Sequence, residues 1–339
     1  MKLSCKHFIL FLTAIGIFPF SGYSQHFYSG FEGDSKVIRT SKKADDIVGG
    51  EVISGVLNDW ERSLEDAKGF GSFDLFQIYY QAGNKRQRRA TIVDDPLAPR
   101  GTNKVLKFEI RKAYPSDKRD KNSPRLGRIA AQLINVDITK GIKETGFSKL
   151  HYGFKMMLPE NYQLIKNDTA YQNSWYTIAE LWNNGGWSNL PYPYRIKLDI
   201  VKYRNSNTLR FVVKGQFKEN GKWQADWEKT NNWYDIPLGE WLDMDIYFKE
   251  GDARRGRFIL KVNKRTIIRA KNRTHHPDAK GRAIDGMTHV DLLKLYTGGD
   301  KIDHMLELGV RPTIYWDDFI IYDDAKTEIR TSFWQSNRD

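Results

Sequence analysis

Residues 194–201 read YRIKLDIV and residues 209–216 read LRFVVKGQ. The first run alternates apolar with polar residues at almost every step, and the second begins in the same way. Successive side chains of a β-strand point to opposite faces of a sheet. Each run therefore predicts a strand with one apolar face for a core and one polar face.

Similar runs recur along the chain and are separated by Gly, Asn, Asp and Pro. They lie at 90–93, 104–110, 128–134, 149–158, 176–182, 194–201, 209–216, 241–248, 257–262, 292–296 and 313–322. Many short strands at regular spacing indicate a large sandwich or barrel. We therefore predict one all-β domain over residues 26–324. Residues 35–70 are polar and poorly periodic and predict irregular excursions, and residues 325–339 predict a polar tail.

The N-terminus has the parts of a secretory signal peptide. Lys2 and Lys6 are basic, residues 8–18 form an apolar run too short to span a bilayer, and small residues follow at 21–24. We predict a cleaved signal peptide over residues 1–25 and a secreted or periplasmic protein. Cys5 is the only cysteine, so the mature chain would have no disulfide, thiol nucleophile or thiolate metal site.

The sequence is strongly basic, with 54 Lys and Arg against 42 Asp and Glu and a net charge of +12. The net charge falls to +10 once Lys2 and Lys6 leave with the signal peptide. Such a charge favours a polyanionic partner, and an exported protein meets acidic glycans more often than nucleic acid. We expect a monomer that binds an anionic polysaccharide, with no nucleic-acid partner and no membrane span.

The polar faces of five predicted strands carry groups that suit such a polymer. These strands have Arg, Lys, Gln, Glu or aromatic residues opposite their apolar positions, at 128–133, 179–182, 195–200, 209–216 and 293–296. A solvated sheet face has the same pattern. If the strands are neighbours in one sheet, however, their polar faces form a positive trough that contains Trp and Tyr.

Several short motifs follow one another in a recognisable order. They are ATIVDDP at 90–96, VLKFEI at 105–110, Gly127-Arg128 at the start of a strand, YTIAELW at 176–182, GEW at 239–241, LKLY at 293–296 and YWDD at 315–318. This order resembles the heparin lyase I and glucuronan lyase group of polysaccharide lyases. The resemblance covers residues 90–322. It implies a concanavalin A-like β-sandwich (jelly roll) with a concave substrate-binding sheet.

The resemblance also implies cleavage of a uronate polymer by β-elimination. This reaction needs a group that neutralises the carboxylate, a base for the adjacent proton and an acid for the leaving oxygen. We expect Arg128 to neutralise the carboxylate, because guanidinium binds it in a bidentate way. Tyr296 is the expected base and also the acid, with Lys294 or Arg195 lowering its pKa. His151 is an alternative base.

The other expected site residues contact the substrate. Gln132 and Asn183 would assist at the carboxylate, and Trp182 and Trp187 would stack on sugars. The remaining expected contacts are Glu180, Arg195, Lys197, Arg210 and Lys214. The sequence departs from the group in three places. Trp182 or Asn183 stands where the group has its catalytic His, the group's Gln appears as Glu180 or is not aligned, and Lys294 and Tyr296 are only two residues apart.

Catalysis is expected to need no cofactor. Glu32, Asp34 and Asp317 are oxygen donors in the first and last segments of the sandwich, where we expect a structural Ca²⁺. The excess of Lys and Arg favours a sulfated uronate polymer, such as ulvan or a heparin-like glycan, over glucuronan and alginate.

Two other functions stay open. One is a non-catalytic glycan-binding protein, which the missing His would fit. The other is a glycoside hydrolase on the same fold, which needs two carboxylates about 5–10 Å apart. The Glu-x-Asp-x-x-Glu signature of laminarinases is absent, because Lys197 stands where the first Glu would be.

Overall fold

The computed structural model describes most of the chain. The described residues are 25–41, 43–65, 75–120, 122–134, 147–170, 174–183, 193–203, 206–278 and 286–322. The predicted signal peptide, apart from its last residue, and the predicted tail lie outside these ranges, and so does Trp187. No helix in these ranges combines the length and the apolar character that crossing a bilayer requires.

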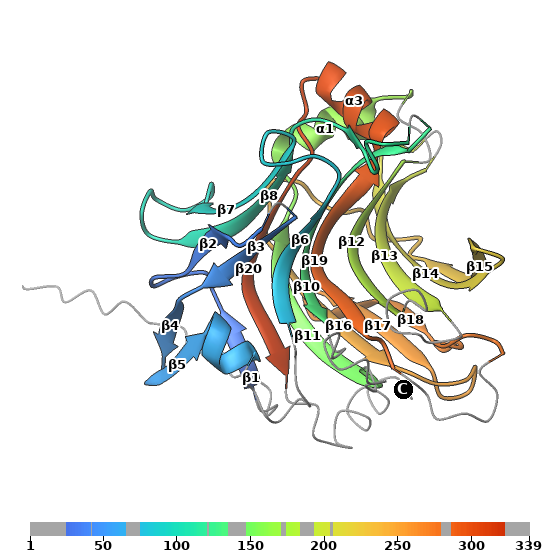
Figure 1. Cartoon of the computed structure of the whole chain (residues 1–339), viewed down its shortest axis with the longest axis horizontal. Helices are drawn as coiled ribbons and strands as arrows, with labels where there is room; N and C mark the ends of the chain where they lie inside the picture. The colour runs from blue at the N-terminus through green and yellow to red at the C-terminus, as the bar shows by residue number, and fades with distance from the viewer. Residues whose placement is uncertain are drawn as a thin grey trace, which may run out of the picture.

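The larger of two main sheets has ten strands within the described residues, and its strand pairs are antiparallel. Their order is β15-β14-β13-β12-β19-β10-β6-β3-β2, and β9 pairs with β10. Figure 1 shows β6, β10, β19, β12, β13 and β14 as curved strands that lie side by side. The strands are β2 (Lys36–Arg39), β3 (Ala44–Val48), β6 (Leu75–Gln81), β9 (Tyr114–Pro115), β10 (Arg125–Ile134), β12 (Ser174–Asn183), β13 (Tyr194–Lys202), β14 (Leu209–Glu219), β15 (Lys222–Thr230) and β19 (His289–Gly298).

The smaller sheet has eight strands in the same described ranges, in the order β18-β17-β16-β11-β20-β8-β7, and β1 pairs with β20. They are β1 (Gln25–Ser29), β7 (Arg88–Asp94), β8 (Lys104–Ile110), β11 (Lys149–Met157), β16 (Leu242–Lys249), β17 (Arg257–Val262), β18 (Arg265–Ala270) and β20 (Thr313–Tyr322). The remaining elements are the hairpin of β4 (Gly50–Ile53) and β5 (Val56–Asp59), the short helical turns η1 (Trp60–Glu65) and η2 (Glu160–Tyr162), and the helices α1 (Gln163–Asn167) and α3 (Gly299–Glu307).

The apolar faces of the two sheets enclose one hydrophobic core. Ile129, Ala131 and Leu133 of β10 are at most 1% exposed, as their alternation predicts, and they belong to the same buried cluster as Tyr152 and Trp316 of the smaller sheet. Full burial of a large apolar side chain stabilises a fold by about 1.5–3 kcal/mol. The predicted fold class, an all-β sandwich, is confirmed.

Residues 35–70 are not the irregular excursion that their sequence predicts. The described part of this segment holds β2, β3 and η1 and the β4–β5 hairpin. Strand β2 is mostly exposed on both faces, so it has no apolar alternation for a pattern to detect. Strands β15 and β18 are likewise absent from the predicted runs, and each lies at an edge of its sheet.

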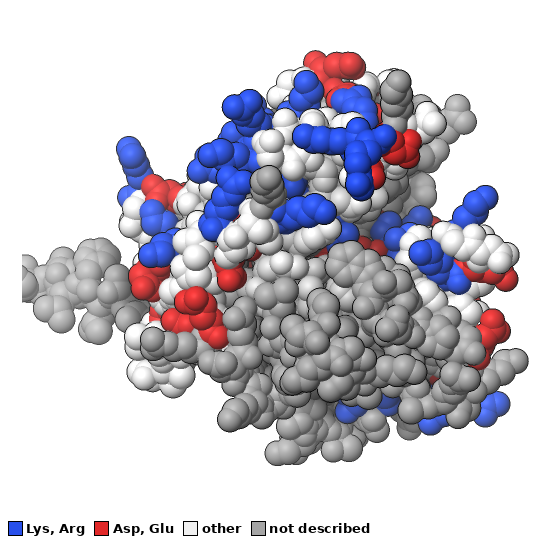
Figure 2. Space-filling model, viewed as in Figure 1, with Lys and Arg blue, Asp and Glu red and all other residues white. Residues whose placement is uncertain are grey.

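Lys and Arg are unevenly distributed over the surface. On the face drawn in Figure 2 they gather over and above the region of β7 and β8. This clustering lies at one end of the sandwich, beside the large sheet.

Candidate functional site

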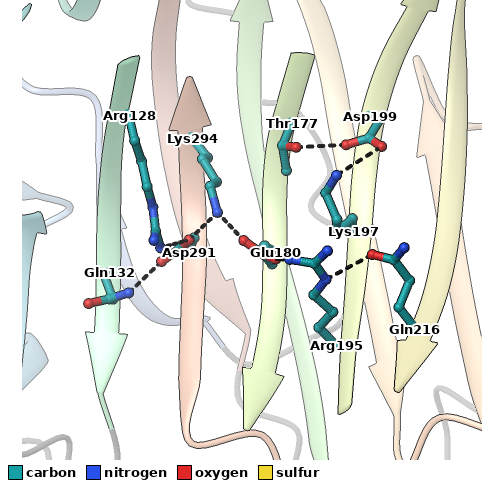
Figure 3. Close-up of polar contacts among 10 residues, drawn as sticks. All are labelled: Arg128, Gln132, Thr177, Glu180, Arg195, Lys197, Asp199, Gln216, Asp291 and Lys294. Atoms are coloured by element: carbon teal, nitrogen blue, oxygen red, sulfur yellow. Dashed lines mark hydrogen bonds and ion pairs between the residues drawn. The ribbon is translucent and has the colours of Figure 1, made fainter. Parts of the chain in front are cut away.

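Six of the predicted site residues lie together on the face of the large sheet that points away from the core (Figure 3): Arg128, Gln132, Glu180, Arg195, Lys197 and Lys294. They come from β10, β19, β12 and β13, which are consecutive strands of the sheet. Tyr296 joins them, because it pairs directly with Arg128 across β10 and β19. The convergence that the sequence predicts is therefore present.

Asp291 lies at the centre of this face, although the sequence did not single it out. Strict alternation along β19 would put Asp291 in the core beside Leu293. The register between β10 and β19 shifts at this point, so that Leu292 is an extra residue in its strand. The extra residue moves the side chains that precede it in the strand to the opposite face of the sheet. Asp291 therefore lies on the same face as Lys294.

The Asp291 carboxylate accepts three hydrogen bonds. Its Oδ2 accepts from Arg128 Nη2 and from Lys294 Nζ, each at 2.6 Å, and its Oδ1 accepts from Gln132 Nε2, also at 2.6 Å. Asp291 and Lys294 are both 0% exposed. Burial of a single charge is costly unless it is paired, so these two residues depend on each other and on their neighbours.

The network continues across the next two strands. Lys294 Nζ also donates to Glu180, whose Oε1 lies 3.3 Å from Arg195 Nη1. Arg195 Nε donates to Gln216 Oε1 at 2.8 Å, and its guanidinium lies 4.2 Å from the centre of the Trp223 ring. Positive and negative groups therefore alternate from β10 to β13 (Figure 3).

A second polar group adjoins the first on β12 and β13. Lys197 Nζ lies 3.3 Å from Asp199 Oδ2, and Thr177 Oγ1 donates to Asp199 Oδ1 at 2.8 Å. A register shift in β12 between Thr177 and Ala179 matches the bulge in β19. The two shifts keep these polar residues on the same face as Glu180.

The face is less positive than the sequence predicts. In the central network three cations, Arg128, Lys294 and Arg195, meet two carboxylates, Asp291 and Glu180. The predicted trough is present with a smaller positive charge than its cations alone would give, because its carboxylates neutralise most of that charge. A surplus of one positive charge remains for an anionic ligand.

The charged groups hold one another ionised. Burial alone would raise the pKa of Glu180, but Lys294 and Arg195 outweigh it and lower the pKa to about 2. Burial would likewise raise the pKa of Asp291, and Arg128 and Lys294 lower it. Burial and the neighbouring Arg128 lower the pKa of Lys294. Neither carboxyl therefore remains protonated at neutral pH.

Tyr296 differs from its prediction in one respect. Burial, followed by the Glu180 carboxylate, raises the pKa of its phenol, whereas Arg128 and Arg195 act in the opposite direction. Lys294 Nζ lies 5.4 Å from the centre of the Tyr296 ring. The prediction that nearby cations bring this pKa below its ordinary value is wrong, so the phenol keeps its proton at neutral pH.

Trp182 and His289 form a second feature of the same face. Their rings lie 4.4 Å apart and are tilted by 31°. Burial lowers the pKa of His289 to about 4, so its imidazole is neutral near pH 7. His289 is not among the residues that the sequence predicts for the site. It begins β19, seven residues before Tyr296, and the charges of Asp291 and Arg128 also act on its pKa.

His151 is not part of this site. It lies on β11 in the smaller sheet, where its ring stacks on Tyr322 at 4.2 Å and its Nε2 lies 3.1 Å from Asp245 Oδ1. Alternation correctly placed His151 opposite the core-facing Tyr152. The prediction of a groove-facing base is nevertheless wrong, because β11 belongs to the other sheet.

Three other predicted residues lie around the site. Lys214 pairs with Lys197 across β13 and β14, and its Nζ lies 2.9 Å from Glu228. Arg210, four residues earlier in β14, donates to Thr208 Oγ1 at 3.1 Å. Asn183 is buried at the end of β12, where its Oδ1 accepts from the backbone N–H of the next strand at 2.6 Å. Asn183 thus supports the strand end and does not reach the network.

The predicted calcium ligands bind backbone groups. Glu32 Oε1 accepts from the N–H of Lys104 at 2.5 Å, and Asp34 Oδ1 accepts from that of Gly50 at 2.7 Å. Asp317 Oδ1 accepts from the N–H of the next residue at 2.8 Å. Within the described ranges no group of three or more His, Cys, Asp or Glu residues could hold a metal ion. A structural Ca²⁺ at Glu32, Asp34 and Asp317 stays a prediction without support from these contacts.

We expect acid to destabilise the protein through Glu180. Its pKa is about 2 in the folded protein against an ordinary 4.5, so its stabilising effect is present above pH 4.5 and is lost as the pH falls toward 2. The free energy of unfolding, measured in urea, should fall less over this interval in Glu180→Gln than in the wild type. Glu228→Gln, an exposed carboxyl on the same sheet, should keep the wild-type slope. Equal slopes for the wild type and Glu180→Gln would contradict this assignment.

The sequence matches no protein-family model and no curated protein. Similar solved structures include an endo-β-1,4-glucuronan lyase from Trichoderma reesei, at 14% identity over 72% of this chain and 90% of that chain, with a TM-score of 0.42. A laminarinase catalytic domain from Thermotoga maritima is 13% identical over 90% and 99% of the two chains, with a TM-score of 0.41. An alginate lyase from Aplysia kurodai is 7% identical over 74% and 92%, with a TM-score of 0.38. The function therefore has to be argued from the site itself.

Proposed function

We propose that the protein binds an acidic, uronate-containing polysaccharide on the polar face of the large sheet and cleaves it by β-elimination. One observation carries the proposal: Arg128 and Tyr296 are direct cross-strand partners, beside Lys294 and Glu180. Their backbones are thus adjacent, the Arg128 guanidinium extends to Asp291, and its charge acts on the phenol of Tyr296. Together they would supply the three functions that the elimination of a uronate requires: Arg128 would neutralise the carboxylate, and Tyr296 would act as both base and acid.

Arg128 is the proposed partner of the substrate carboxylate. One of its terminal nitrogens already binds Asp291, but its Nε is buried and has no hydrogen-bond partner among the described residues. A buried N–H without a partner costs free energy. The Arg128 side chain as a whole is 12% exposed, and a substrate carboxylate bound at its accessible edge would withdraw charge from the carbon that loses its proton.

Tyr296 is the proposed proton carrier. The Tyr296 phenolate takes the proton next to the carboxylate, the carbon–carbon double bond forms as the neighbouring carbon–oxygen bond breaks, and the phenol gives that proton to the leaving oxygen. Because burial raises the pKa of Tyr296, only a small fraction of it is phenolate at neutral pH. Abstraction of the substrate proton requires the phenolate, which Arg128 and Arg195 favour electrostatically. The rate of elimination should therefore increase as the pH is raised above neutrality.

A non-catalytic glycan-binding protein is the second candidate. The mutual neutralisation of the central charges favours it, since the carboxylates of the network are paired with its cations. A glycoside hydrolase is disfavoured. Glu180 and Asp291 are paired residues on adjacent strands, but the pKa of each is lowered, so neither supplies the protonated carboxyl that hydrolysis requires.

The activity can be tested directly on defined polymers. We expect the wild type to release unsaturated, ultraviolet-absorbing ends from at least one of ulvan, a heparin-like glycan, glucuronan and alginate. No absorbance change on any of them would overturn the lyase proposal. New reducing ends without that absorbance would indicate a hydrolase, and binding without chain shortening would indicate the binding protein.

We also propose that the mature protein acts outside the cytoplasm as a monomer. The proposal rests on the predicted signal peptide and on the expected polymeric substrate. N-terminal sequencing of the exported protein should find a chain that starts at residue 25 or 26.

A further inference from the structure

Five exposed cations lie next to the site and form a surface that we call the basic rim: Lys43, Lys85, Arg86, Lys112 and Lys118. Within the described residues none of them takes part in an ion pair, unlike the cations of the central network. Figure 2 shows Lys and Arg gathered over this end of the sandwich. The rim is thus a concentration of positive charge without direct ion pairs among the described residues, and Asp117 is near enough for Lys43 to help lower the pKa of its carboxyl.

The first segment of the rim is the turn between β6 and β7. Arg88 is buried and holds this turn, because its Nε donates to Ala82 O and its Nη2 to Gly83 O, both at 2.8 Å. Lys85 and Arg86 project from the turn that Arg88 braces. Cations on a fixed backbone lose less entropy when they bind a ligand than cations on a free loop.

The second segment follows β8 and leads to β10. The backbone N–H of Lys112 donates to Gln87 O at 3.2 Å, which joins this segment to the first. Ser116 and Ser123 bind each other through their hydroxyls at 2.6 Å and close the loop that carries Lys118. Both ends of the rim are therefore held by internal hydrogen bonds.

The rim lies close to Arg128 in the sheet. Gln81, the last residue of β6 before the turn, pairs with Arg128. The short strand β9 pairs with Arg125 and Leu126 of β10, the latter two residues before Arg128. Lys43 accepts through its carbonyl from the N–H of Tyr80, the neighbour of Gln81. A polysaccharide chain that is bound at Arg128 would therefore reach the basic rim after crossing only a few residues of the protein.

We infer that the basic rim binds the sulfate or carboxylate groups of the same polysaccharide, beyond the sugar that is held at Arg128. The inference rests on the proposed function and adds to it a preference for long, densely charged, sulfated chains over short ones. A polymer carries anionic groups at regular intervals, so several exposed cations can bind it at once. Each exposed contact contributes little alone, about 0.2–1 kcal/mol, but several on one chain act together.

The test uses the triple variant Lys85→Gln/Arg86→Gln/Lys112→Gln with heparin of one chain length as the probe. We expect its Kd for heparin at low salt to rise about 10-fold over the wild type, which corresponds to about 1.4 kcal/mol. The slope of log Kd against log salt should fall by roughly two to three, one for each lost contact. Its Kd for a disaccharide of the same polymer should not change. The matched control is Arg254→Gln/Lys264→Gln/Lys271→Gln, three exposed cations at the far edge of the smaller sheet.

Equal Kd values of the rim variant and the control variant for heparin would overturn the inference that the basic rim binds the polysaccharide. Wild-type affinity for double-stranded DNA or for anionic vesicles as high as that for heparin, with an equal loss in the rim variant, would also overturn the assignment to a polysaccharide. The two proposals fail separately. If the rim variant loses heparin affinity while the wild type releases no unsaturated product from any polymer, the rim stands and the lyase proposal falls.

Discussion

Lys294→Met should lower the free energy of unfolding by about 3–5 kcal/mol, because it leaves Glu180 and Asp291 as buried carboxylates without their shared cation. Both carboxylates lie on adjacent strands and pair across β12 and β19, so they would also repel each other. Methionine has nearly the volume of lysine, so the loss would come from charge rather than from packing. Urea unfolding of the purified variant measures the effect.

Lys214→Met is the matched control for this experiment. Lys214 lies on the same face and is paired with Glu228 at 2.9 Å, but both side chains are partly exposed, 32% and 46%. Such a pair contributes only about 0–1 kcal/mol. Adding Glu180→Gln to Lys294→Met should restore part of the lost stability. A loss below that of the control, or no recovery in the double variant, would show that the buried network does not stabilise the fold as described.

Tyr296→Phe should reduce the rate of product formation by about 10²–10⁴-fold, the usual contribution of a positioned proton donor or acceptor. The substitution removes one hydroxyl and keeps the ring, so Arg128, Lys294 and Asp291 retain the contacts that they make with one another. Affinity for the polymer should stay within a few-fold of the wild type. The remaining activity should also lose the increase with pH that the raised pKa of Tyr296 predicts. Initial rates at several pH values, with the binding constant measured separately, separate these effects.

Tyr203→Phe provides the comparison, since the Tyr203 hydroxyl bonds Thr230 Oγ1 at 2.9 Å just beyond the end of β13. It should leave the rate unchanged. A Tyr296→Phe variant with the full wild-type rate would remove Tyr296 from the chemistry, even if Arg128 still binds the substrate.

Alternation predicts from the sequence that Arg128, Glu180, Arg195 and Tyr296 lie on the polar faces of their strands. That these strands are neighbours in one sheet comes from the topology. Asp291 could not be predicted in the same way. Its facing depends on a bulge, and a bulge is created by the register with neighbouring strands and leaves no mark on local periodicity. Its one local signal is its spacing of three residues from Lys294.

His151 illustrates a second limit of the sequence. Alternation assigns a side chain to one face of its own strand but does not say to which sheet the strand belongs. β11 pairs with β16 and β20, which are distant in sequence, so only the topology removes His151 from the site. Strand β2 shows a third limit, because its exposed residues carry no apolar pattern from which a strand could be predicted.

The most direct test of the central claim is a crystal structure of Tyr296→Phe with an oligosaccharide of the polymer that the wild type cleaves. We expect a uronate carboxylate within about 3 Å of the Arg128 guanidinium, with the bond to be broken next to position 296. An oligosaccharide bound on the outer face of the smaller sheet, or bound without contact to Arg128, would contradict this account.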